Sequence, residues 1–418
     1  MPALISNIVY TTGIALYSAA IALASPFNEK AALLRKGRKK SFSILETKVN
    51  PNLSYVWFHA ASLGEFEQGR PVLEALKVKH PELPILLTFF SPSGYEIRKS
   101  YAGADVICYL PADTRSNAVK LLNSVNVKAA LFIKYEFWAH YLSELERRGI
   151  PVYSFSAIFR SNQLFFKSYG GWYLRLLNSF RKIYVQDEQS LQLLNEFKVQ
   201  QAQVAGDTRF DRVAALATSA KSFPLVERFI GKSDSVIVAG SSWPADEELL
   251  ARYIQEHPDT KLILVPHEIN EAHLQGISKK FPESLRYTRL NGDATANTNC
   301  LVIDTIGMLS SIYQYATIAY IGGGFGVGIH NTLEAAVWEV PVVFGPAWHK
   351  FREAADLIKL GAGFSIADYD ELRDCFHRLH DDTRAGKIAG DYVKRNTGAS
   401  ALIIEQLTND LYAKTIDS

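Results

Sequence analysis

Short β-branched runs alternate with longer helical stretches along most of this chain, and this rhythm restricts the fold more than any other feature. Such runs are found at residues 55–60, 85–90, 106–110, 129–133, 152–157 and 183–186. A second series follows a weakly patterned stretch near residues 213–232, with runs at 236–239, 262–265, 301–303, 318–321 and 342–344. The alternation predicts βαβ units and parallel sheets covered on both faces. We therefore expect an α/β protein with two doubly wound, Rossmann-like domains and a hinge between them.

The chain length agrees with two domains, because 418 residues exceed the ~100 to 200 that one domain usually holds. The predicted boundaries are residues 1–28 for an apolar N-terminal segment, 29–212 for the first domain and 213–418 for the second. An alternative for the last helix is that it crosses back and packs on the first domain. We find no internal repeat and no low-complexity tract.

The overall charge and the cysteines exclude several classes of protein. The 45 Lys and Arg residues nearly balance the 43 Asp and Glu residues, so the net charge gives no reason to expect nucleic acid as a partner. Cys108, Cys300 and Cys375 are widely spaced and show no metal-ligand pattern. We therefore predict a reducing compartment, without a disulfide framework or a zinc site.

The N-terminus departs from this globular pattern. Residues 1–28 contain no charged side chain, and their apolar part reaches the ~20 residues that a membrane-spanning helix needs. A secretory signal carries its cations before the apolar run, whereas here they follow it, at Lys30, Arg35, Lys36, Arg38, Lys39 and Lys40. This order predicts a membrane anchor with the following domain on the cytoplasmic side. Because several Ser and Thr residues dilute the span, a helix in the interface or packed on the body remains an alternative.

A glycine-rich segment at residues 322–328 follows the run 318–321 and precedes His330-Asn331-Thr332-Leu333-Glu334. A strand that passes through glycines into a helix capped by Asn offers backbone N–H groups to a phosphate. The alternative is a tight turn at a strand end. The segment does not fit G-x-G-x-x-G, and the chain has no Gly-Lys-Ser/Thr P-loop, which excludes dinucleotide dehydrogenases and P-loop NTPases.

In the first domain, two carboxylates and one cation follow predicted strands. Glu65 comes shortly after the first run, in a helix whose N-terminus favours its anion, and it is either a helix cap or a general base. Glu136 follows the fourth run. Arg209 lies near the hinge and either makes a surface ion pair or holds a phosphate or carboxylate.

In the second domain, polar segments marked by Gly or Pro follow successive strands. They begin at Gly240, Pro266 and Asp304, and the glycine-rich segment is the fourth. Ligands of doubly wound sheets bind beyond the carboxyl ends of the strands, so these segments predict a mononucleotide site. Asp368-Tyr369-Asp370 lies beside a helical pattern and is interpreted as a helix cap, so a metal held on a diphosphate is not supported.

Taken in order, these motifs resemble the 3-deoxy-D-manno-octulosonic acid (Kdo) transferases of lipopolysaccharide synthesis. The resemblance rests on the apolar N-terminus, the basic residues 36–39, the segment 57–65, Glu136-Phe137-Trp138, the segment 206–211 and the segment 330–336. It implies the GT-B glycosyltransferase fold, with a cleft between the two domains. It also implies inverting transfer of Kdo from CMP-Kdo to the lipid A precursor, lipid IVA, at the cytoplasmic face of the bacterial inner membrane.

The resemblance also assigns roles to residues. Glu65 is implied as the general base, and Glu136 and Arg209 as stabilisers of the transition state. Since the leaving group is a monophosphate, no metal or other cofactor is implied; the partners are CMP-Kdo, the lipid A precursor and membrane lipids, and no nucleic acid. The positions that match contacts to the CMP moiety are Pro266, His267, Gly307, Met308, Leu309, Asn331, Thr332, Leu333 and Glu334.

Several positions depart from the family pattern. Arg209 stands where relatives commonly carry Lys, and His267 stands where a basic residue is usual, which makes its charge depend on pH. Trp243-Pro244 replaces a more polar segment, and Met308 replaces a common acidic residue. Two other functions remain open: a GT-B enzyme that uses a UDP-sugar, and a catalytically silent lipid-binding relative.

One further segment interleaves aromatic residues with Arg160, Lys167 and Arg175. Such a pattern suits a membrane interface and the phosphates of a lipid acceptor. An ordinary amphipathic helix packed against the sheet is the alternative.

Overall fold

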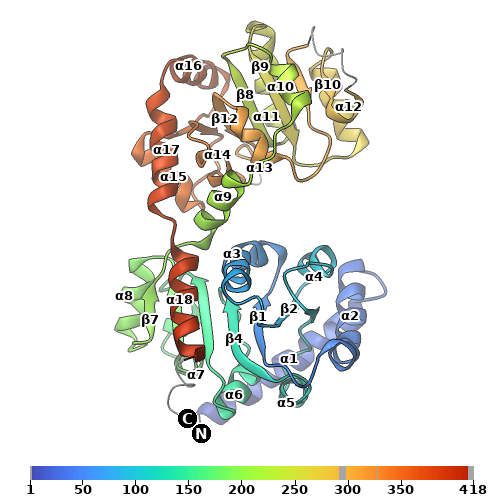
Figure 1. Cartoon of the computed structure of the whole chain (residues 1–418), viewed down its shortest axis with the longest axis vertical. Helices are drawn as coiled ribbons and strands as arrows, with labels where there is room; N and C mark the ends of the chain where they lie inside the picture. Colours follow the sequence, from blue (N-terminus) through green and yellow to red (C-terminus); the bar gives the residue numbers. More distant parts are fainter. Residues whose placement is uncertain (1, 291–297, 327, 413–418) are drawn as a thin grey trace. The chain divides into compact units, whose positions relative to one another are not determined.

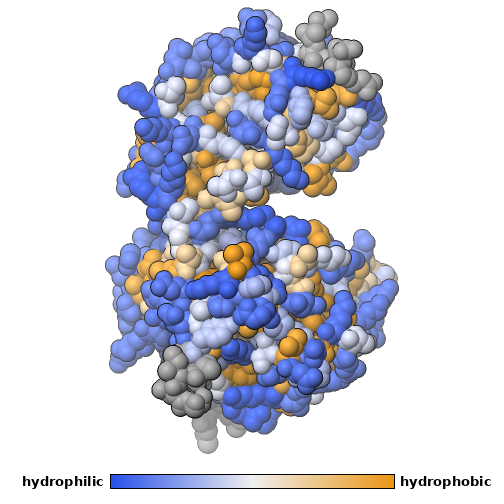
Figure 2. Space-filling model, in the orientation of Figure 1, coloured by the Kyte–Doolittle hydropathy of each residue, from blue (hydrophilic) through white to orange (hydrophobic). Residues whose placement is uncertain are grey.

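The computed structural model describes residues 2–290, 298–326 and 328–412. The chain divides into two compact units, which we name unit 1 (Met1–Arg212 with Thr397–Ser418) and unit 2 (Val213–Asn396). Each unit contains one seven-stranded sheet with helices packed against it (Figure 1). The surface visible in Figure 2 is mostly hydrophilic, with apolar side chains exposed in scattered patches.

The sheet of unit 1 is parallel throughout and has the strand order β3-β2-β1-β4-β5-β6-β7. Every residue of β1 and β2 is buried, because helices cover both faces of the sheet, and this explains why the strands are continuous apolar runs. The carboxyl end of β1 adjoins those of β2 and β4. The strands are β1 (Tyr55–Ala60), β2 (Ile85–Phe89), β3 (Val106–Tyr109), β4 (Val127–Ile133), β5 (Val152–Ala157), β6 (Lys182–Val185) and β7 (Ala202–Val204).

The helices of unit 1 include one from the far end of the chain. Helix α18 packs against α3 and buries Ile403, Ile404 and Leu407 in the same apolar cluster as β1. The carboxylate of Asp211 accepts hydrogen bonds from the backbone N–H groups of Gly398 (2.6 Å) and Ser400 (2.7 Å), which fixes the start of α18. The helices are α1 (Pro2–Ala24), α2 (Glu29–Lys48), α3 (Leu63–Lys79), α4 (Pro92–Arg98), α5 (Arg115–Ser124), α6 (Ala139–Arg147), α7 (Gly171–Asn178), α8 (Glu188–Glu196), α9 (Thr208–Thr218) and α18 (Ala399–Tyr412).

Helix α1 packs on unit 1 along one stripe and exposes apolar side chains elsewhere. Tyr10, Ile14 and Ser18 are half-buried at four-residue intervals, which places them on one face of the helix. On other faces, Leu16 and Leu23 are 66% and 76% exposed. The stretch Ser6–Ala24 is long and apolar enough to cross a membrane. Helix α1 therefore packs on unit 1 with one face and exposes apolar side chains on the others.

The sheet of unit 2 is also parallel, in the order β10-β11-β9-β8-β12-β13-β14. The strands are β8 (Val236–Ser242), β9 (Lys261–Pro266), β10 (Leu285–Arg286), β11 (Cys300–Val302), β12 (Ile318–Ile321), β13 (Val342–Phe344) and β14 (Gly363–Ser365). The helices are α10 (Pro224–Ile230), α11 (Pro244–Glu256), α12 (Glu271–Lys280), α13 (Leu309–Ile312), α14 (Leu333–Ala336), α15 (Arg352–Leu360), α16 (Tyr369–His380) and α17 (Thr383–Arg395).

The structure contains elements that the sequence did not predict. Strands β7, β10 and β14 have only two or three residues each and are mostly not buried, so they lack the apolar run that the equally short β11 and β13 show. The weakly patterned stretch near residues 213–232 is largely helical, because it holds the end of α9 and all of α10. Helix α10 begins with Pro224 and buries Val226 and Phe229, which are three residues apart and share one face.

Candidate active site

Glu65 lies in the first turn of α3, just beyond the carboxyl end of β1. Ser62 is the N-cap of this helix, and its hydroxyl accepts a hydrogen bond from the backbone N–H of Glu65 at 3.4 Å. The carboxylate of Glu65 turns back and accepts a hydrogen bond from the backbone N–H of Ala61 at 2.6 Å. Gly64 is the second residue of the helix. Glu65 therefore helps to cap α3 and also stands at the edge of the sheet where ligands bind.

Burial raises the pKa of Glu65 to about 7, and the negative charge of Glu136 adds to this shift. The hydrogen bond from Ala61 and the charge of Lys134 oppose it. The expectation that the helix N-terminus would hold Glu65 as a stable anion is thus corrected, because the loss of hydration outweighs the helix end. A carboxylate with a pKa near 7 can both accept and release a proton near neutral pH, as a general base must.

Glu136 follows β4, the neighbour of β1 in the sheet, and is held by two side chains. Its Oε2 accepts a hydrogen bond from Nε1 of Trp138 at 2.8 Å and lies 3.2 Å from Nε2 of His59. His59 is fully buried on β1, and its Nδ1 lies 2.8 Å from Oγ1 of Thr88 on β2. The structure thus brings Glu65 and Glu136 together from adjacent strands. His59 and Trp138 were not predicted to be functional, although both lie in segments that resemble the family, 57–65 and 136–138.

Arg209 is the second residue of α9 and is paired with the carboxylate of Asp207. Oδ2 of Asp207 lies 2.8 Å from Nε and 2.7 Å from Nη2 of Arg209, and Oδ1 accepts the backbone N–H of the same residue. Thr208 lies between these two residues in the sequence, and its hydroxyl donates to the backbone carbonyl of Gln68 on α3 at 2.5 Å. Arg209 is therefore attached to α3, the helix that carries Glu65. Of the two interpretations of Arg209, the ion pair with Asp207 agrees with that of an ion-pair residue.

In unit 2, three aromatic rings gather at the carboxyl ends of β8, β9 and β12. The ring of His267, directly after Pro266, stacks on Trp243 with centroids 4.8 Å apart and lies 4.4 Å from His330. Nε1 of Trp243 donates to Nε2 of His330 at 3.3 Å, so that nitrogen must accept. Burial, and then the neighbouring His267, lower the pKa of His330. His330 is therefore neutral at pH 7, whereas the ring of His267 is exposed.

The other predicted nucleotide contacts lie on two short helices. Gly307 has φ +89 and precedes Met308, the N-cap of α13, while Leu309 lies close to Gly240 at the end of β8. Asn331 donates from Nδ2 to Glu334 at 3.0 Å and accepts the backbone N–H of Leu333 at 3.1 Å.

The predicted passage from strand to helix is correct for the cap but not for the length of the helix. Oδ1 of Asn331 accepts the backbone N–H of Leu333, as a capping side chain does, but α14 has only four residues, too short to build a substantial helix dipole. Thr332 and Leu333 are buried, and within the described residues the hydroxyl of Thr332 has no hydrogen-bond partner. Any anion here would be held mainly by loop N–H groups and side chains.

The glycines of residues 322–328 are required mainly by packing of the backbone. A Cβ atom at Gly322 would overlap the carbonyl of Ser241, and one at Gly324 would lie 2.5 Å from the backbone nitrogen of Gly345. These contacts favour the tight-turn interpretation at both positions. Val327 lies outside the described residues.

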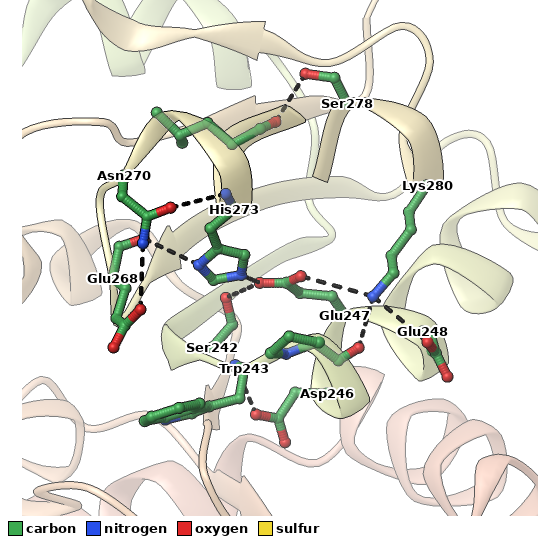
Figure 3. Close-up of polar contacts among 12 residues, drawn as sticks. Ser242, Trp243, Asp246, Glu247, Glu248, Glu268, Asn270, His273, Ser278 and Lys280 are labelled. Carbon is green, nitrogen blue, oxygen red and sulfur yellow. Dashed lines mark hydrogen bonds and ion pairs between the residues drawn. The ribbon is translucent and has the colours of Figure 1, made fainter. Parts of the chain in front are cut away.

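A buried cluster supports the segments that follow β8 and β9 (Figure 3). Glu247 is 1% exposed and accepts from Oγ of Ser242 at 3.0 Å, and it lies 2.8 Å from Nε2 of His273. Nδ1 of His273 lies 2.9 Å from the carbonyl of Glu268 and so donates to it. This cluster was not predicted, although the acidic residues in the first turn of α11 were a signal for it.

The described residues contain no group of three or more His, Cys, Asp or Glu side chains that could hold a metal ion. The carboxylate of Asp368 caps α16 by accepting the backbone N–H of Glu371 at 3.0 Å, which confirms the prediction for that motif.

Several known proteins are similar to this chain in sequence or in fold. Residues 28–212 match the family model described as 3-deoxy-D-manno-octulosonic-acid transferase (kdotransferase). The chain is 28% identical over 330 residues to the 3-deoxy-D-manno-octulosonic acid transferase of Aquifex aeolicus, covering 76% of this chain and 83% of that protein. It is 26% identical to the enzyme of the same name from Chlamydia muridarum, covering 83% of each chain.

Solved structures show the fold. The UDP-GlcNAc 2-epimerase of Neisseria meningitidis superimposes with a TM-score of 0.62 at 15% identity, covering 85% of this chain and all of that one. MurG of Acinetobacter baumannii superimposes with a TM-score of 0.53 at 14% identity, covering 85% and 99%. The predicted α/β class with two parallel sheets of the GT-B type is confirmed. Residues 28–212 thus match a Kdo transferase domain, and most of the chain is similar in sequence to Kdo transferases, which supports a glycosyltransferase activity.

Proposed function

We propose that this protein transfers Kdo from CMP-Kdo to lipid IVA, the lipid A precursor, with inversion at the anomeric carbon. The observation that carries the proposal is the state of Glu65, a half-buried carboxylate whose pKa is raised to about 7 at the carboxyl end of β1. Similarity to Kdo transferases supports the choice of sugar, and the position of Glu65 supports its role as a base for a sugar hydroxyl.

In the proposed step, Glu65 takes the proton of an acceptor hydroxyl while that oxygen attacks the anomeric carbon of Kdo. The new glycosidic C–O bond forms as the bond from that carbon to the phosphate oxygen breaks, and CMP leaves with the electron pair. Glu136, held by Trp138, provides negative charge for the oxocarbenium-like centre. Arg209 provides positive charge for the donor, in an orientation fixed by Asp207.

The donor nucleotide is assigned to unit 2. His267 presents an exposed ring that can donate to the phosphate, while His330 stays neutral beside it. Asn331 and Glu334 form a hydrogen-bonded pair with polar groups suited to a ribose or a base. Pro266, Gly307, Met308, Leu309, Thr332 and Leu333 complete the proposed CMP contacts, and we propose that no metal takes part.

The lipid acceptor is assigned to the membrane surface. Exposed apolar side chains on α1 lie next in sequence to the exposed cations Lys30, Arg35, Lys36, Lys39 and Lys40 of α2. Apolar side chains enter the acyl region and cations attract anionic headgroups. We therefore propose a location on the cytoplasmic side of the bacterial inner membrane. The cations of the segment 160–175 are exposed as well, whereas Phe165 packs on Phe137 with centroids 5.1 Å apart.

The test is a transfer assay with CMP-Kdo and a tetraacylated disaccharide acceptor, using wild type, Glu65→Gln and the control Glu46→Gln, whose side chain is 62% exposed. General-base catalysis contributes about 10²- to 10⁴-fold, so Glu65→Gln should lose that much turnover and keep CMP binding by calorimetry. Full activity in Glu65→Gln would refute the base assignment. Turnover of a UDP-sugar in place of CMP-Kdo would support another GT-B activity, and lipid binding without any transfer would indicate a silent relative.

A further inference from the structure

Phe90 connects the N-terminal helices with the neighbourhood of Glu136. It follows β2 directly, and its backbone N–H donates to the carbonyl of Ala60 on β1. Its ring stacks on Trp138 with centroids 4.8 Å apart and an interplanar angle of 22°. The ring of Tyr17 on α1 stacks on Phe90 at 5.9 Å and 21°, and the guanidinium carbon of Arg38 on α2 lies 4.7 Å from the Phe90 centroid.

A second contact from α1 reaches the backbone next to Trp138. The hydroxyl of Tyr10 donates to Oδ2 of Asp113 at 2.5 Å and lies 3.4 Å from the backbone nitrogen of Ala139. The same carboxylate accepts the backbone N–H groups of His140 and Tyr141 at 3.2 and 3.1 Å. Asp113 therefore fixes the start of α6, and Trp138 is the residue that precedes that helix. Tyr10 and Tyr17, seven residues apart on α1, thus contact two neighbours of Trp138: the start of α6 and the ring of Phe90.

Trp138 in turn sets the position of the Glu136 carboxylate. Its Nε1 lies 2.8 Å from Oε2 of Glu136 and 3.1 Å from Nε2 of His59. His59 is itself fixed, because it is fully buried and its other ring nitrogen contacts Thr88. The position of the Glu136 carboxylate therefore depends on the indole of Trp138, whose own neighbours are Phe90 and the start of α6.

We infer that α1 is a positioning element for the reaction: through Tyr17, Phe90 and Trp138 it orients Glu136 beside Glu65. The inference rests on the proposed function for its catalytic consequence. The physical reason is that a carboxylate placed on a developing positive charge must be held closely, since a displacement of ~1 Å can cost ~10²-fold in rate. When Tyr17 no longer covers Phe90, the indole of Trp138 loses a stacked support, and Glu136 loses part of its alignment.

Two measurements test this in the full chain. The first is kinetics with an acceptor that lacks acyl chains, in detergent micelles, so that membrane attachment plays no part. Tyr17→Ala and Phe90→Leu should each lower kcat about 3- to 10-fold, the range that the loss of one aromatic pair corresponds to, and leave KM for CMP-Kdo unchanged. Tyr17→Phe keeps the ring and should restore activity. The matched control is Leu16→Ala, the adjacent residue on the same helix, which is 66% exposed and should behave as wild type.

The pH profile separates positioning from simple anchoring. If Glu136 moves away from Glu65, the like charge that raises the pKa of Glu65 weakens, so the acid limb of kcat should shift to lower pH in Tyr17→Ala and Phe90→Leu. A helix that serves only as an anchor would leave this limb in place. The inference would be overturned if Tyr17→Ala and Phe90→Leu both had the same kcat and the same acid limb as Leu16→Ala.

The second measurement does not depend on turnover. Hydrogen exchange of the peptide spanning residues 134–142 should become faster in Tyr17→Ala than in Leu16→Ala, because that peptide carries Trp138 and the start of α6. A wild-type protein without Kdo transfer would contradict the proposed function alone. Equal exchange rates in the two variants would contradict the coupling of α1 to Trp138, whatever the protein transfers.

Discussion

The backbone N–H of Ala61 donates a 2.6 Å hydrogen bond to the carboxylate of Glu65, at the turn where β1 passes into α3. This contact keeps the carboxylate at the edge of the sheet, where Glu136 arrives from the adjacent strand. The hydrogen bond favours the anion, yet burial together with Glu136 raises the pKa of Glu65 to about 7. A group with these opposing influences is sensitive to small changes in its surroundings.

The pH dependence of transfer should report this state. Since the base must be unprotonated, kcat should fall as the pH falls through about 7, the pKa of Glu65. Glu136→Gln removes the like charge, which lowers the pKa of Glu65 and moves the acid limb to lower pH, in addition to reducing kcat. A pH–rate series on both proteins checks this. A limb that stays in place would mean that Glu136 does not influence Glu65.

Glu65→Gln should stabilise the protein at alkaline pH. The pKa of Glu65 is raised from 4.5 to about 7 in the folded state, so the folded protein holds a proton that the unfolded chain releases between these values. The wild type therefore loses stability as the pH rises through this window. At pH 8 the variant should be more stable by about 1–3 kcal/mol, from ~1.4 kcal/mol per pKa unit, and the gain should vanish near pH 4.5. Thermal melting at pH 4.5 and pH 8 measures it; an equal gain at both would point to packing instead of charge.

The pairing of Arg209 with Asp207 should matter for its orientation. Arg209→Lys keeps the charge but loses the planar contact with Asp207, and Arg209→Ala loses both. Turnover should therefore decrease in the order wild type, lysine variant, alanine variant, with about tenfold lost where a charge-assisted contact of ~1.5 kcal/mol is removed. Steady-state kinetics of the two variants test the order. An alanine variant as active as the wild type would limit Arg209 to a structural ion pair.

The glycines of the loop after β12 should differ in their tolerance of a side chain. Gly322→Ala places a Cβ atom against the carbonyl of Ser241, so the backbone must move, whereas a Cβ atom at Gly326 meets nothing within 4 Å. We expect Gly322→Ala to be destabilised by about 1–3 kcal/mol, typical of overpacking, with weaker CMP binding. Gly326→Ala is the matched control and should melt and bind CMP as the wild type does. Similar behaviour of the two variants would remove the packing role assigned to Gly322.

Much of the architecture was already determined by the sequence. The apolar runs at 55–60, 236–239 and 318–321 became strands because both faces of a parallel sheet are buried, which leaves a continuous signal. The Asp368 cap was also predicted, since it depends on a side chain and a backbone group three residues apart. Patterns of this kind are local, and a chain shows them without its tertiary contacts.

The state of the site was decided only by the tertiary structure. The sequence predicts Glu65 at a helix N-terminus, which favours its anion, but burial and the charge of Glu136, which follows the adjacent strand, reverse that preference. Asn331 caps α14 as expected, by accepting the backbone N–H of Leu333, but the folded chain gives that helix only four residues. His59 and Trp138, which hold Glu136, are far from each other in the sequence and meet because β1 and β4 are neighbours in the sheet. Hydration and long-range proximity are properties of the folded chain, and no spacing in the sequence records them.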